Sequence, residues 1–193
     1  MYVIGIGGFK RSGKDTFGRL LKEAAEQRGV VAITTAFADP VRGAAAPIYG
    51  YGTSTFHFIK PESKDEVNPR WGITPRQMMI NVGEAMRAIN PDHWVKLWRE
   101  YIGDVKENVL VIVTDVRQRN EAHAVKALGG SLVLLQRSGI VWDGTQVELL
   151  AHDAAEQQGT FDYTVKNDGD VASLRRHADR IVRRVLDKAT KKS

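Results

Sequence analysis

Short apolar runs alternate along this chain with longer stretches in which apolar residues recur at helical spacing. The runs at 2–6, 30–36, 109–114, 131–136 and 163–166 predict strands, because most are rich in Val, Ile and Leu and lie between glycines or polar residues. After the first run, apolar residues follow the i, i+3, i+4, i+7 spacing of a helix with one buried side: Phe17, Leu20, Leu21, Ala24 and Ala25. This alternation predicts an α/β fold with a parallel sheet and helices on both of its faces.

Capping and turn residues divide the rest of the chain. Gly29 ends the first helix, and Asp39 is the expected N-cap of a second helix with Pro40 in its first turn. The segment 74–77 (Thr-Pro-Arg-Gln) predicts a capping box that opens a third helix. The apolar stripes of this helix and of the next are expected to be Met78, Met79, Val82, Met86 and Ile89, and Trp94, Leu97, Trp98 and Tyr101. Residues 50–73 and 138–160 look irregular, and the later segment is a candidate lid.

The loop from Gly8 to Thr16 carries the clearest chemical signal. Gly8, Gly13 and Lys14 match the phosphate-binding pattern G-x-x-x-x-G-K between a predicted strand and a predicted helix. Glycines let backbone N–H groups surround phosphate oxygens, and the following helix directs its positive end at the same oxygens. The lysine adds a mobile positive charge for the β- and γ-phosphates. The alternative, a glycine turn that binds nothing, is disfavoured by the order of strand, loop, lysine and helix.

One position departs from the pattern. A Ser or Thr that holds magnesium normally follows the lysine, whereas here Asp15 follows it and Thr16 comes one residue later. A carboxylate next to phosphates is repelled unless a cation lies between them, so we expect Asp15 and Thr16 to be magnesium ligands, directly or through water.

Two acidic residues follow predicted strands at the edge of the sheet where ligands bind in α/β folds. Asp39 comes after the second run, and Asp115 follows the strong apolar run at 109–114, as in a Walker B arrangement that helps to hold magnesium. Arginines that suit phosphate groups occur nearby in the sequence or on predicted helices: Arg42, Arg76, Arg87 and Arg117. Arg76 and Arg87 lie off the apolar stripe and are equally compatible with a solvated surface.

Composition narrows the possibilities further. The 193 residues are 42% hydrophobic, which is compatible with a single domain, and no apolar run is long enough to span a membrane. The absence of cysteine and of a recognisable signal peptide predicts a cytoplasmic protein. The net charge of +5 is concentrated after residue 174, where eight Lys or Arg accompany two Asp. We interpret this basic segment as a solvated helix face and not as a nucleic-acid site.

Several segments together resemble the deoxynucleoside monophosphate kinases of tailed bacteriophages. The loop 10–16 (Lys-Arg-Ser-Gly-Lys-Asp-Thr) is similar to that family's loop, in which Gly-Lys-Asp-Thr replaces the usual sequence. Four further segments resemble the family in the same order along the chain: Trp94–Leu97, Thr114–Gln118 with Asn120 and Glu121, His152–Glu156, and Asn167–Gly169 with Leu174. The resemblance implies a three-layer P-loop kinase fold with a five-stranded parallel sheet, a helical acceptor-binding part at about 40–105 and a lid at about 137–160. It also implies transfer of the ATP γ-phosphoryl group to a deoxynucleoside monophosphate with Mg²⁺.

These arguments assign candidate roles to the residues. Lys14, Lys10 and Arg137 are the expected catalytic residues, with Lys10 between the donor and acceptor phosphates and Arg137 closing over the transferred group. ATP-binding candidates are Gly8, Arg11, Ser12, Gly13, Lys14, Asp15, Thr16 and Phe17. Acceptor-binding candidates are Lys10, Phe37, Asp39, Arg42, Arg76, Arg87, Asp115 and Arg117, and metal-binding candidates are Asp15, Thr16 and Asp115. Phe37, Trp71 and Trp142 are alternatives for stacking on a base.

Two other functions stay open at this point. Phosphomevalonate kinases share a similar Lys-x-Ser-Gly-Lys-Asp loop, so the acceptor could be another small phosphate. The basic C-terminal segment raises the alternative of a regulatory module that binds nucleotide or DNA without turnover. The expected partners are small-molecule nucleotides, with a homodimer possible and with neither a membrane nor nucleic acid.

Overall fold

The structure is a computed structural model that describes residues 1–53, 63–140 and 160–190, with side chains through residue 188. Its strands are β1 (Tyr2–Gly7), β2 (Val31–Thr35), β3 (Val109–Val113), β4 (Ser131–Gln136) and β5 (Tyr163–Lys166). Its helices are α1 (Lys14–Glu26), α2 (Ala38–Ile48), α4 (Pro75–Ile89), α5 (His93–Gly103), α6 (Arg119–Ala127) and α8 (Val171–Thr190). The expected strands are confirmed to within two residues at each end. Most of the expected lid, with Trp142, His152 and Glu156, lies outside the described residues.

The chain divides into two compact units, which are treated separately. The first contains residues 1–36 and 103–193 and holds the whole sheet, whose strand order is β2-β3-β1-β4-β5 with every pair parallel. β1 lies at the centre, where Ile4 pairs with both Ile112 of β3 and Ser131 of β4. The loop that follows β1 therefore starts from the middle of the carboxyl edge of the sheet. Parallel pairing and central burial of β1 agree with its continuous apolar sequence.

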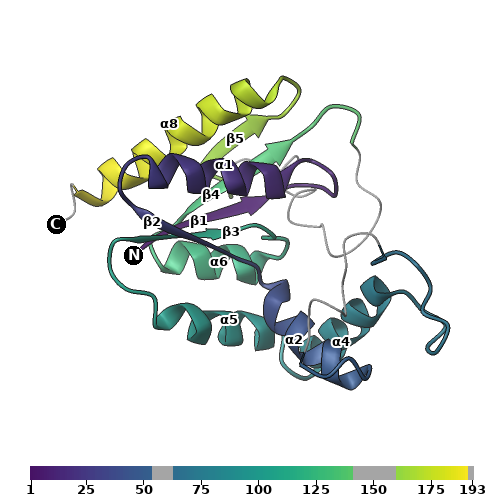
Figure 1. Cartoon of the computed structure of the whole chain (residues 1–193). Helices are drawn as coiled ribbons and strands as arrows, with labels where there is room; N and C mark the ends of the chain where they lie inside the picture. The colour runs from purple at the N-terminus through teal and green to yellow at the C-terminus, as the bar shows by residue number, and fades with distance from the viewer. Residues whose placement is uncertain (54–62, 141–159, 191–193) are drawn as a thin grey trace. The chain divides into compact units, whose positions relative to one another are not determined.

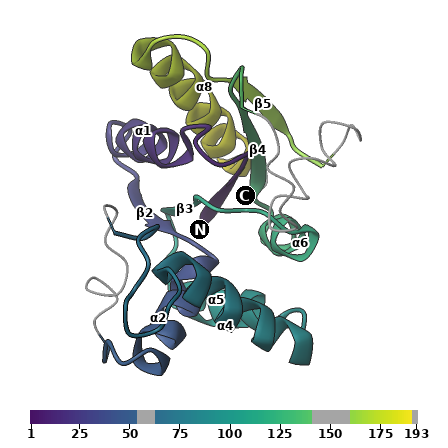
Figure 2. The same cartoon turned by 90° about the vertical axis from the view of Figure 1, so that its right-hand side faces the viewer.

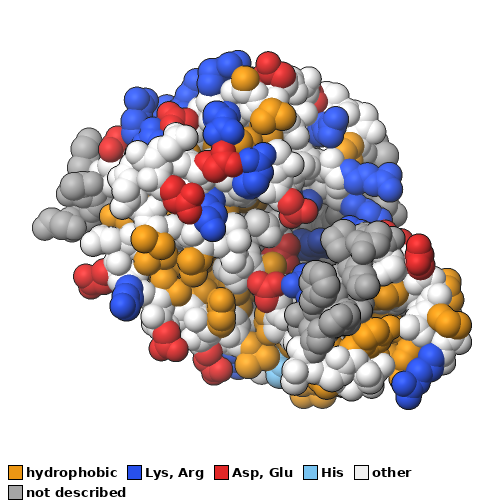
Figure 3. Space-filling model, in the orientation of Figure 1, with side chains coloured by type: hydrophobic (Ala, Val, Ile, Leu, Met, Phe, Trp, Pro, Cys, Tyr) orange, Lys and Arg blue, Asp and Glu red, His pale blue; other side chains and the backbone are white. Residues whose placement is uncertain are grey.

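One face of the sheet is covered by α1 and α8 (Figures 1 and 2). The core between them contains Ile4 and Ile6 of β1, together with Phe17 and Leu21 of α1 and Ile181 of α8. Because side chains alternate along a strand, only every second residue of β1 faces this core. At the surface, Glu23 of α1 pairs with Arg19 and with Arg175 of α8, and Figure 3 shows such mixed charges over α1. The hydrogen bond from Arg175 holds the pKa of Glu23 below its usual value.

The opposite face of the sheet packs closely against α6 (Figure 2). A Cβ atom at Gly5 would lie 2.8 Å from Leu132 and 3.2 Å from Val125 of α6. A Cβ atom at Gly130 would likewise lie 2.7 Å from the Val125 carbonyl. The missing side chains therefore let the helix approach the sheet. With helices on both faces, the first unit has the expected three-layer arrangement of an α/β fold.

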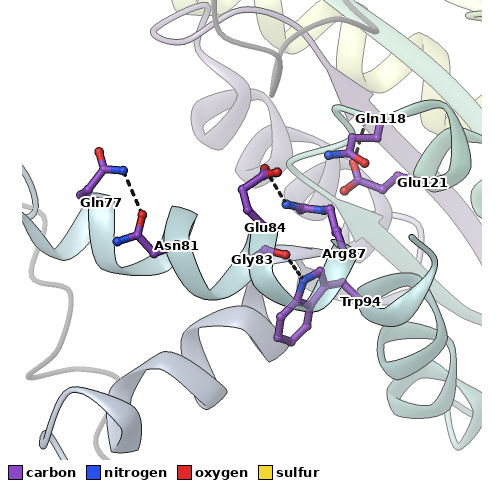
Figure 4. A network of polar contacts seen from close by, with 8 residues as sticks. All are labelled: Gln77, Asn81, Gly83, Glu84, Arg87, Trp94, Gln118 and Glu121. Carbon is purple, nitrogen blue, oxygen red and sulfur yellow. Dashed lines mark hydrogen bonds and ion pairs between the residues drawn. The ribbon is translucent and has the colours of Figure 1, made fainter. Parts of the chain in front are cut away.

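The second unit, residues 37–102, contains α2, α4 and α5. Its core includes Val41 and Ala45 of α2, Met78 and Val82 of α4, and Trp94 of α5. The Trp94 indole donates a hydrogen bond of 3.0 Å to the Gly83 carbonyl, which joins α5 to α4 (Figure 4). Thr74 caps α4 as expected, because its hydroxyl accepts from Gln77 N at 3.1 Å. The Gln77 side-chain amide donates to Asn81 and does not bond back to the Thr74 N–H, so only half of the predicted capping box is formed.

Three details of these helices differ from the sequence interpretation. α2 begins two residues earlier than expected, with Phe37 as N-cap, so Asp39 lies inside the first turn and pairs with Arg42. On α5 the buried residues are Trp94, Val95, Trp98 and Ile102, whereas Leu97 and Tyr101 are exposed. On α4, Ile89 is 78% exposed, although it continues the methionine stripe. On α4 and α5, helical spacing left more than one face possible, and packing selected one.

No helix in the described ranges combines the length and the apolar composition that a membrane-spanning segment needs.

Candidate nucleotide-binding site

The loop between β1 and α1 has the backbone of a phosphate-binding turn. Gly8 and Gly13 have φ values of 144° and 96°, and Arg11 has a φ of 66°. Positive φ is easily reached by glycine and is uncommon for arginine, so this is a tightly shaped loop. Ser12 N donates to the Phe9 carbonyl at 3.2 Å, and α1 begins at Lys14. The helix N-terminus thus directly follows the loop, as the sequence predicted.

Both glycines are also required by space. A Cβ atom at Gly8 would lie 2.4 Å from the Leu135 carbonyl oxygen of β4. At Gly13 it would lie 2.5 Å from Nδ2 of Asn167, the first residue after β5. The loop is therefore packed against the carboxyl ends of β4 and β5, and neither contact leaves room for a side chain.

The lysine of the motif is held by the loop itself. Lys14 Nζ donates to the Gly8 and Phe9 carbonyl oxygens, each at 2.7 Å. These bonds place a positive charge next to the loop amides. An anion bound by the loop would find an ammonium donor already in position.

A second polar group of the loop, the Ser12 hydroxyl, is buried. The Ser12 side chain is only 1% exposed, and its hydroxyl makes no hydrogen bond within the described part of the chain. A buried unpaired hydroxyl is unfavourable, and such groups in native proteins usually have a function or a bound partner. Ser12 is thus positioned to bond a ligand that enters the loop.

The first turn of α1 supplies the metal candidates. Asp15 is exposed and Thr16 is partly buried. A Cβ atom at Gly18 would lie 2.9 Å from Thr114, so glycine lets this turn approach the end of β3, next to Asp115. Phe17, in contrast, is fully buried in the core and its N–H bonds to the Gly13 carbonyl. Contrary to expectation, neither the Phe17 side chain nor its amide is available to ATP, because the core and the helix use them.

The chain after β3 is fixed by a buried carboxylate. Glu121 is 4% exposed and accepts hydrogen bonds from Arg117 N at 2.7 Å and Gln118 N at 3.0 Å; Gln118 and Glu121 appear in Figure 4. These bonds set the path of the backbone that carries Arg117. Asp115, two residues earlier, lies at the carboxyl edge of the sheet and is half-buried. The Asp115–Arg117 pair is therefore in the same unit as the phosphate loop.

The acceptor candidates of the second unit are engaged with neighbours inside that unit. Arg42 pairs with Asp39 at 2.7 Å, Arg76 pairs with Asp65 at 2.5 Å, and Arg87 pairs with Glu84 at 3.3 Å (Figure 4). The sequence left Arg76 and Arg87 as ligand-binding candidates or surface charges, and in this structure each is paired with a carboxylate. These pairs are partly exposed, so each contributes little to stability and could exchange for a phosphate.

Phe37 differs most from its expected role. Its ring is 2% exposed and lies 4.5 Å from the Trp98 ring, centroid to centroid. Such burial gives Phe37 a place in the packing of the second unit and leaves no open face for a base. Trp71, the described alternative, is 39% exposed and donates from its indole to the Tyr49 carbonyl.

The remaining candidate residues with a positive charge belong to the first unit. Lys10, Arg11 and Arg117 form no ion pair with any described residue. Arg137 directly follows β4; hydrogen bonds from Ser138 are the main cause that lowers the pKa of Asp168, and the charge of Arg137 adds to this effect. The first unit thus brings together the loop, Lys10, Arg11, Asp115 and Arg117 in one connected fold. The convergence of Arg42, Arg76 and Arg87 on the loop stays a prediction.

Sequence reasoning did not assign a role to Asn167. Its side-chain amide donates to the Ser12 carbonyl at 2.8 Å, across 155 positions of sequence. In the sequence, Asn167 belonged only to a segment that resembles the kinase family, Asn167–Gly169 with Leu174. No local pattern could reveal a partner so distant along the chain.

Comparison with known proteins identifies the family of the chain. The deoxynucleotide monophosphate kinase family matches residues 53–177. The chain is also 32% identical over 165 residues to a putative deoxynucleotide monophosphate kinase of Acanthamoeba polyphaga mimivirus, covering 77% of this chain and 82% of the relative. The chain belongs to the deoxynucleotide monophosphate kinase family. As a member of this family it is a nucleotide kinase, and the family resemblance noted in the sequence is confirmed.

Two further similarities extend this result. The deoxynucleotide monophosphate kinase of Escherichia phage RB69 is 25% identical over 134 residues, which cover 65% of this chain and 52% of the phage protein. Dephospho-CoA kinase from Campylobacter jejuni has a similar structure, with a TM-score of 0.52 at 16% identity over 98% of this chain and the whole of that one. This last likeness concerns the fold alone. It confirms the P-loop kinase architecture of this deoxynucleotide monophosphate kinase family member.

Proposed function

We propose that this protein transfers the γ-phosphoryl group of ATP to the phosphate of a deoxynucleoside monophosphate and releases a diphosphate and ADP. The observation that carries the proposal is the loop 8–16, in which glycines with positive φ, Lys14 and a buried Ser12 hydroxyl that has no partner among the described residues lie together at a helix N-terminus. Family membership supplies the class of acceptor.

On the donor side, the loop amides and Lys14 hold the β- and γ-phosphates of ATP. Lys14 leaves the Gly8 and Phe9 carbonyls and donates to phosphate oxygens instead. Arg11 and Ser12 add donors at the same loop. Phosphoryl transfer requires mainly positioning and neutralisation of the charge that develops on the transferred group, and these fixed donors supply both.

On the acceptor side, the attacking group is already an anionic phosphate oxygen. It therefore needs cations that hold it close to the donor, and no strong base. Lys10 and Arg117, which form no ion pair with a described residue, are the leading candidates for bridging the two phosphates. Arg42, Arg76 and Arg87 would exchange their carboxylate partners for the acceptor. Arg137 would neutralise the group in transfer.

The donor set at the loop suits Mg²⁺. No cluster of three or more acidic, histidine or cysteine side chains exists among the described residues, and Mg²⁺ does not require one. It keeps several waters and takes one or two protein oxygens besides phosphate. The Thr16 hydroxyl and the Asp15 and Asp115 carboxylates fit that description. When bound, the ion would neutralise phosphate charge and offset the repulsion between Asp15 and ATP.

The decisive experiment measures ADP release from ATP and magnesium with a panel of deoxynucleoside monophosphates, ribonucleoside monophosphates and phosphomevalonate. We expect acceptor-dependent ADP with at least one deoxynucleoside monophosphate. Lys14→Ala should lower this rate by about 10²–10³-fold, because it removes a charge aimed at the transferred group. Lys22→Ala, on the exposed side of the same helix, is the matched control and should retain the rate.

The other outcomes are equally informative. ADP release with phosphomevalonate alone would replace the acceptor and keep the enzyme class. Absence of acceptor-dependent ADP, together with salt-sensitive DNA binding, would favour the regulatory module.

A further inference from the structure

The turn after β5 holds the phosphate loop from behind. Asn167 Nδ2 donates to the Ser12 carbonyl oxygen at 2.8 Å, and Asn167 N donates to the Gln136 carbonyl of β4 at 2.7 Å. The side chain is thus fixed at its base by the sheet and at its tip by the loop. There is no free space between Asn167 and Gly13, since Nδ2 lies 2.5 Å from the position that a Cβ atom on Gly13 would occupy.

The bond to Ser12 controls the orientation of one peptide group. The Ser12 carbonyl and the Gly13 N–H belong to the same planar trans peptide, in which C=O and N–H point in opposite directions. When Asn167 holds the carbonyl, the Gly13 N–H points away from Asn167. A peptide next to glycine reverses with little steric resistance, because glycine populates both signs of φ. An external hydrogen bond is therefore needed to keep one orientation.

The neighbouring residue secures the same turn to the chain after β4. Asp168 accepts hydrogen bonds from Ser138 N at 2.6 Å and from Ser138 Oγ at 2.9 Å. These bonds to the charged form lower the pKa of the Asp168 carboxyl, so it is ionised at neutral pH. Ser138 directly follows Arg137. One two-residue turn thus connects the phosphate loop with the start of the segment that carries Arg137.

We propose that Asn167 is a positioning residue for ATP binding, whose side-chain amide fixes the Ser12–Gly13 peptide so that the Gly13 N–H serves the phosphate site. Asp168 keeps Asn167 in place through Ser138. This inference rests on the proposed function for its reaction, while its own readout is the affinity for ATP without any acceptor.

The test compares three variants by calorimetric titration with ATP and magnesium. Asn167→Ala removes the donor, and Asn167→Asp keeps the shape but places an acceptor opposite the Ser12 carbonyl. We expect both to bind ATP about tenfold more weakly, the effect of one hydrogen bond that orients the loop. Asp170→Ala is the matched control, because Asp170 follows the same turn but its carboxylate accepts a hydrogen bond from Ser173 N of α8. Its ATP affinity should match that of the unsubstituted protein.

A pH series separates positioning from general stability. A protonated Asp at position 167 can again donate to the Ser12 carbonyl. Relative to the unsubstituted protein, the Asn167→Asp variant should therefore regain ATP affinity as the pH falls from about 6 toward about 4, because an aspartate carboxyl takes up its proton near pH 3.9 and the neighbouring carbonyl and phosphate oxygens oppose its charge. Asn167→Ala should show no such recovery.

The outcomes distinguish failure of the positioning role of Asn167 from failure of the proposed reaction. Unchanged ATP affinity in Asn167→Ala, or an equal loss in Asp170→Ala, would overturn the positioning role. If the unsubstituted protein binds ATP but phosphorylates no monophosphate, the proposed reaction fails while the Asn167 comparison still decides the inference. A protein that binds no ATP at all would overturn both.

Discussion

At the scale of single residues, the phosphate loop needs glycine for two separate reasons. Gly13 has a φ of 96°, and it also lies against the Asn167 amide. The first requirement is visible in the motif, because turns that bind phosphate use positive φ. The second arises only because β5 ends beside the loop.

Replacing Gly13 by alanine should therefore impair ATP binding more than folding. The new Cβ would displace Asn167 and favour negative φ, which we expect to weaken ATP binding at least about tenfold and to cost about 1–3 kcal/mol of stability. ATP titration and urea unfolding measure the two effects. At Gly43 in α2, an added Cβ atom would have no neighbour within 4 Å. Gly43→Ala should instead stabilise the protein by about 0.5–1 kcal/mol. Equal ATP affinity in Gly13→Ala would contradict the role of the loop.

The Asp168 carboxyl offers a second residue-level prediction. Hydrogen bonds from Ser138 lower its pKa from the usual 3.8. Its contribution to folding is then complete above about pH 4 and is lost as the pH falls through the lowered pKa. Carbon-detected NMR should show Asp168 titrating below 3.8, and Ser138→Ala should move the pKa upward, toward that value. Alanine keeps the backbone N–H donor, so a pKa unaffected by Ser138→Ala would show that the bond from the Ser138 hydroxyl is not formed in solution.

At the scale of elements, α4 and α5 of the second unit are joined by one buried polar contact. The Trp94 side chain is 3% exposed and donates to the Gly83 carbonyl. Glycine at position 83 also leaves room for the Arg87 side chain, since a Cβ atom there would lie 3.2 Å from the Arg87 guanidinium. The indole thus acts both as packing volume and as a donor.

Trp94→Phe removes the donor and part of the volume. We expect a loss of about 2–4 kcal/mol, measured by urea unfolding with far-ultraviolet circular dichroism. Trp71→Phe is the control, because this indole is 39% exposed and its bond to Tyr49 is open to water. It should change stability by less than about 1 kcal/mol. Similar losses in both variants would mean that burial of Trp94 contributes nothing specific.

At the scale of the whole molecule, the close approach of α6 to the sheet depends on a small residue in the central strand. Gly5 belongs to β1, which pairs with two neighbouring strands, and the same strand leads into the phosphate loop. A disturbance there should affect the whole first unit.

Gly5→Ala places a Cβ atom 2.8 Å from Leu132 and 2.9 Å from Val116. The side chains would have to move, which we expect to cost about 1–3 kcal/mol and to lower the melting temperature in a thermal scan. Gly103→Ala, which has no atom within 4 Å, should leave the melting temperature nearly unchanged. An unchanged Gly5→Ala protein would indicate a looser packing of α6 than the structure has.

Much of this molecule follows from local sequence. The strands, the helix starting at Lys14 and the glycine loop could be predicted because strand periodicity, turn residues and motif spacing act over a few positions. The wrong predictions of burial concern Leu97 and Tyr101, which lie on a helix with more than one apolar face. The expected role of Phe37 in stacking on a base was wrong because its ring packs against Trp98. Phe17 is likewise buried, because its position on the helix points its side chain into the core.

The sequence by itself determined the order of the elements, the phosphate loop and the family of the protein, because these depend on short-range spacing. Only the tertiary structure decided which residues support the loop. It brought Asn167 to Ser12 and Asp168 to Ser138. The physical reason is that parallel strands place their carboxyl ends at one edge of the sheet, so residues far apart in the chain become neighbours there.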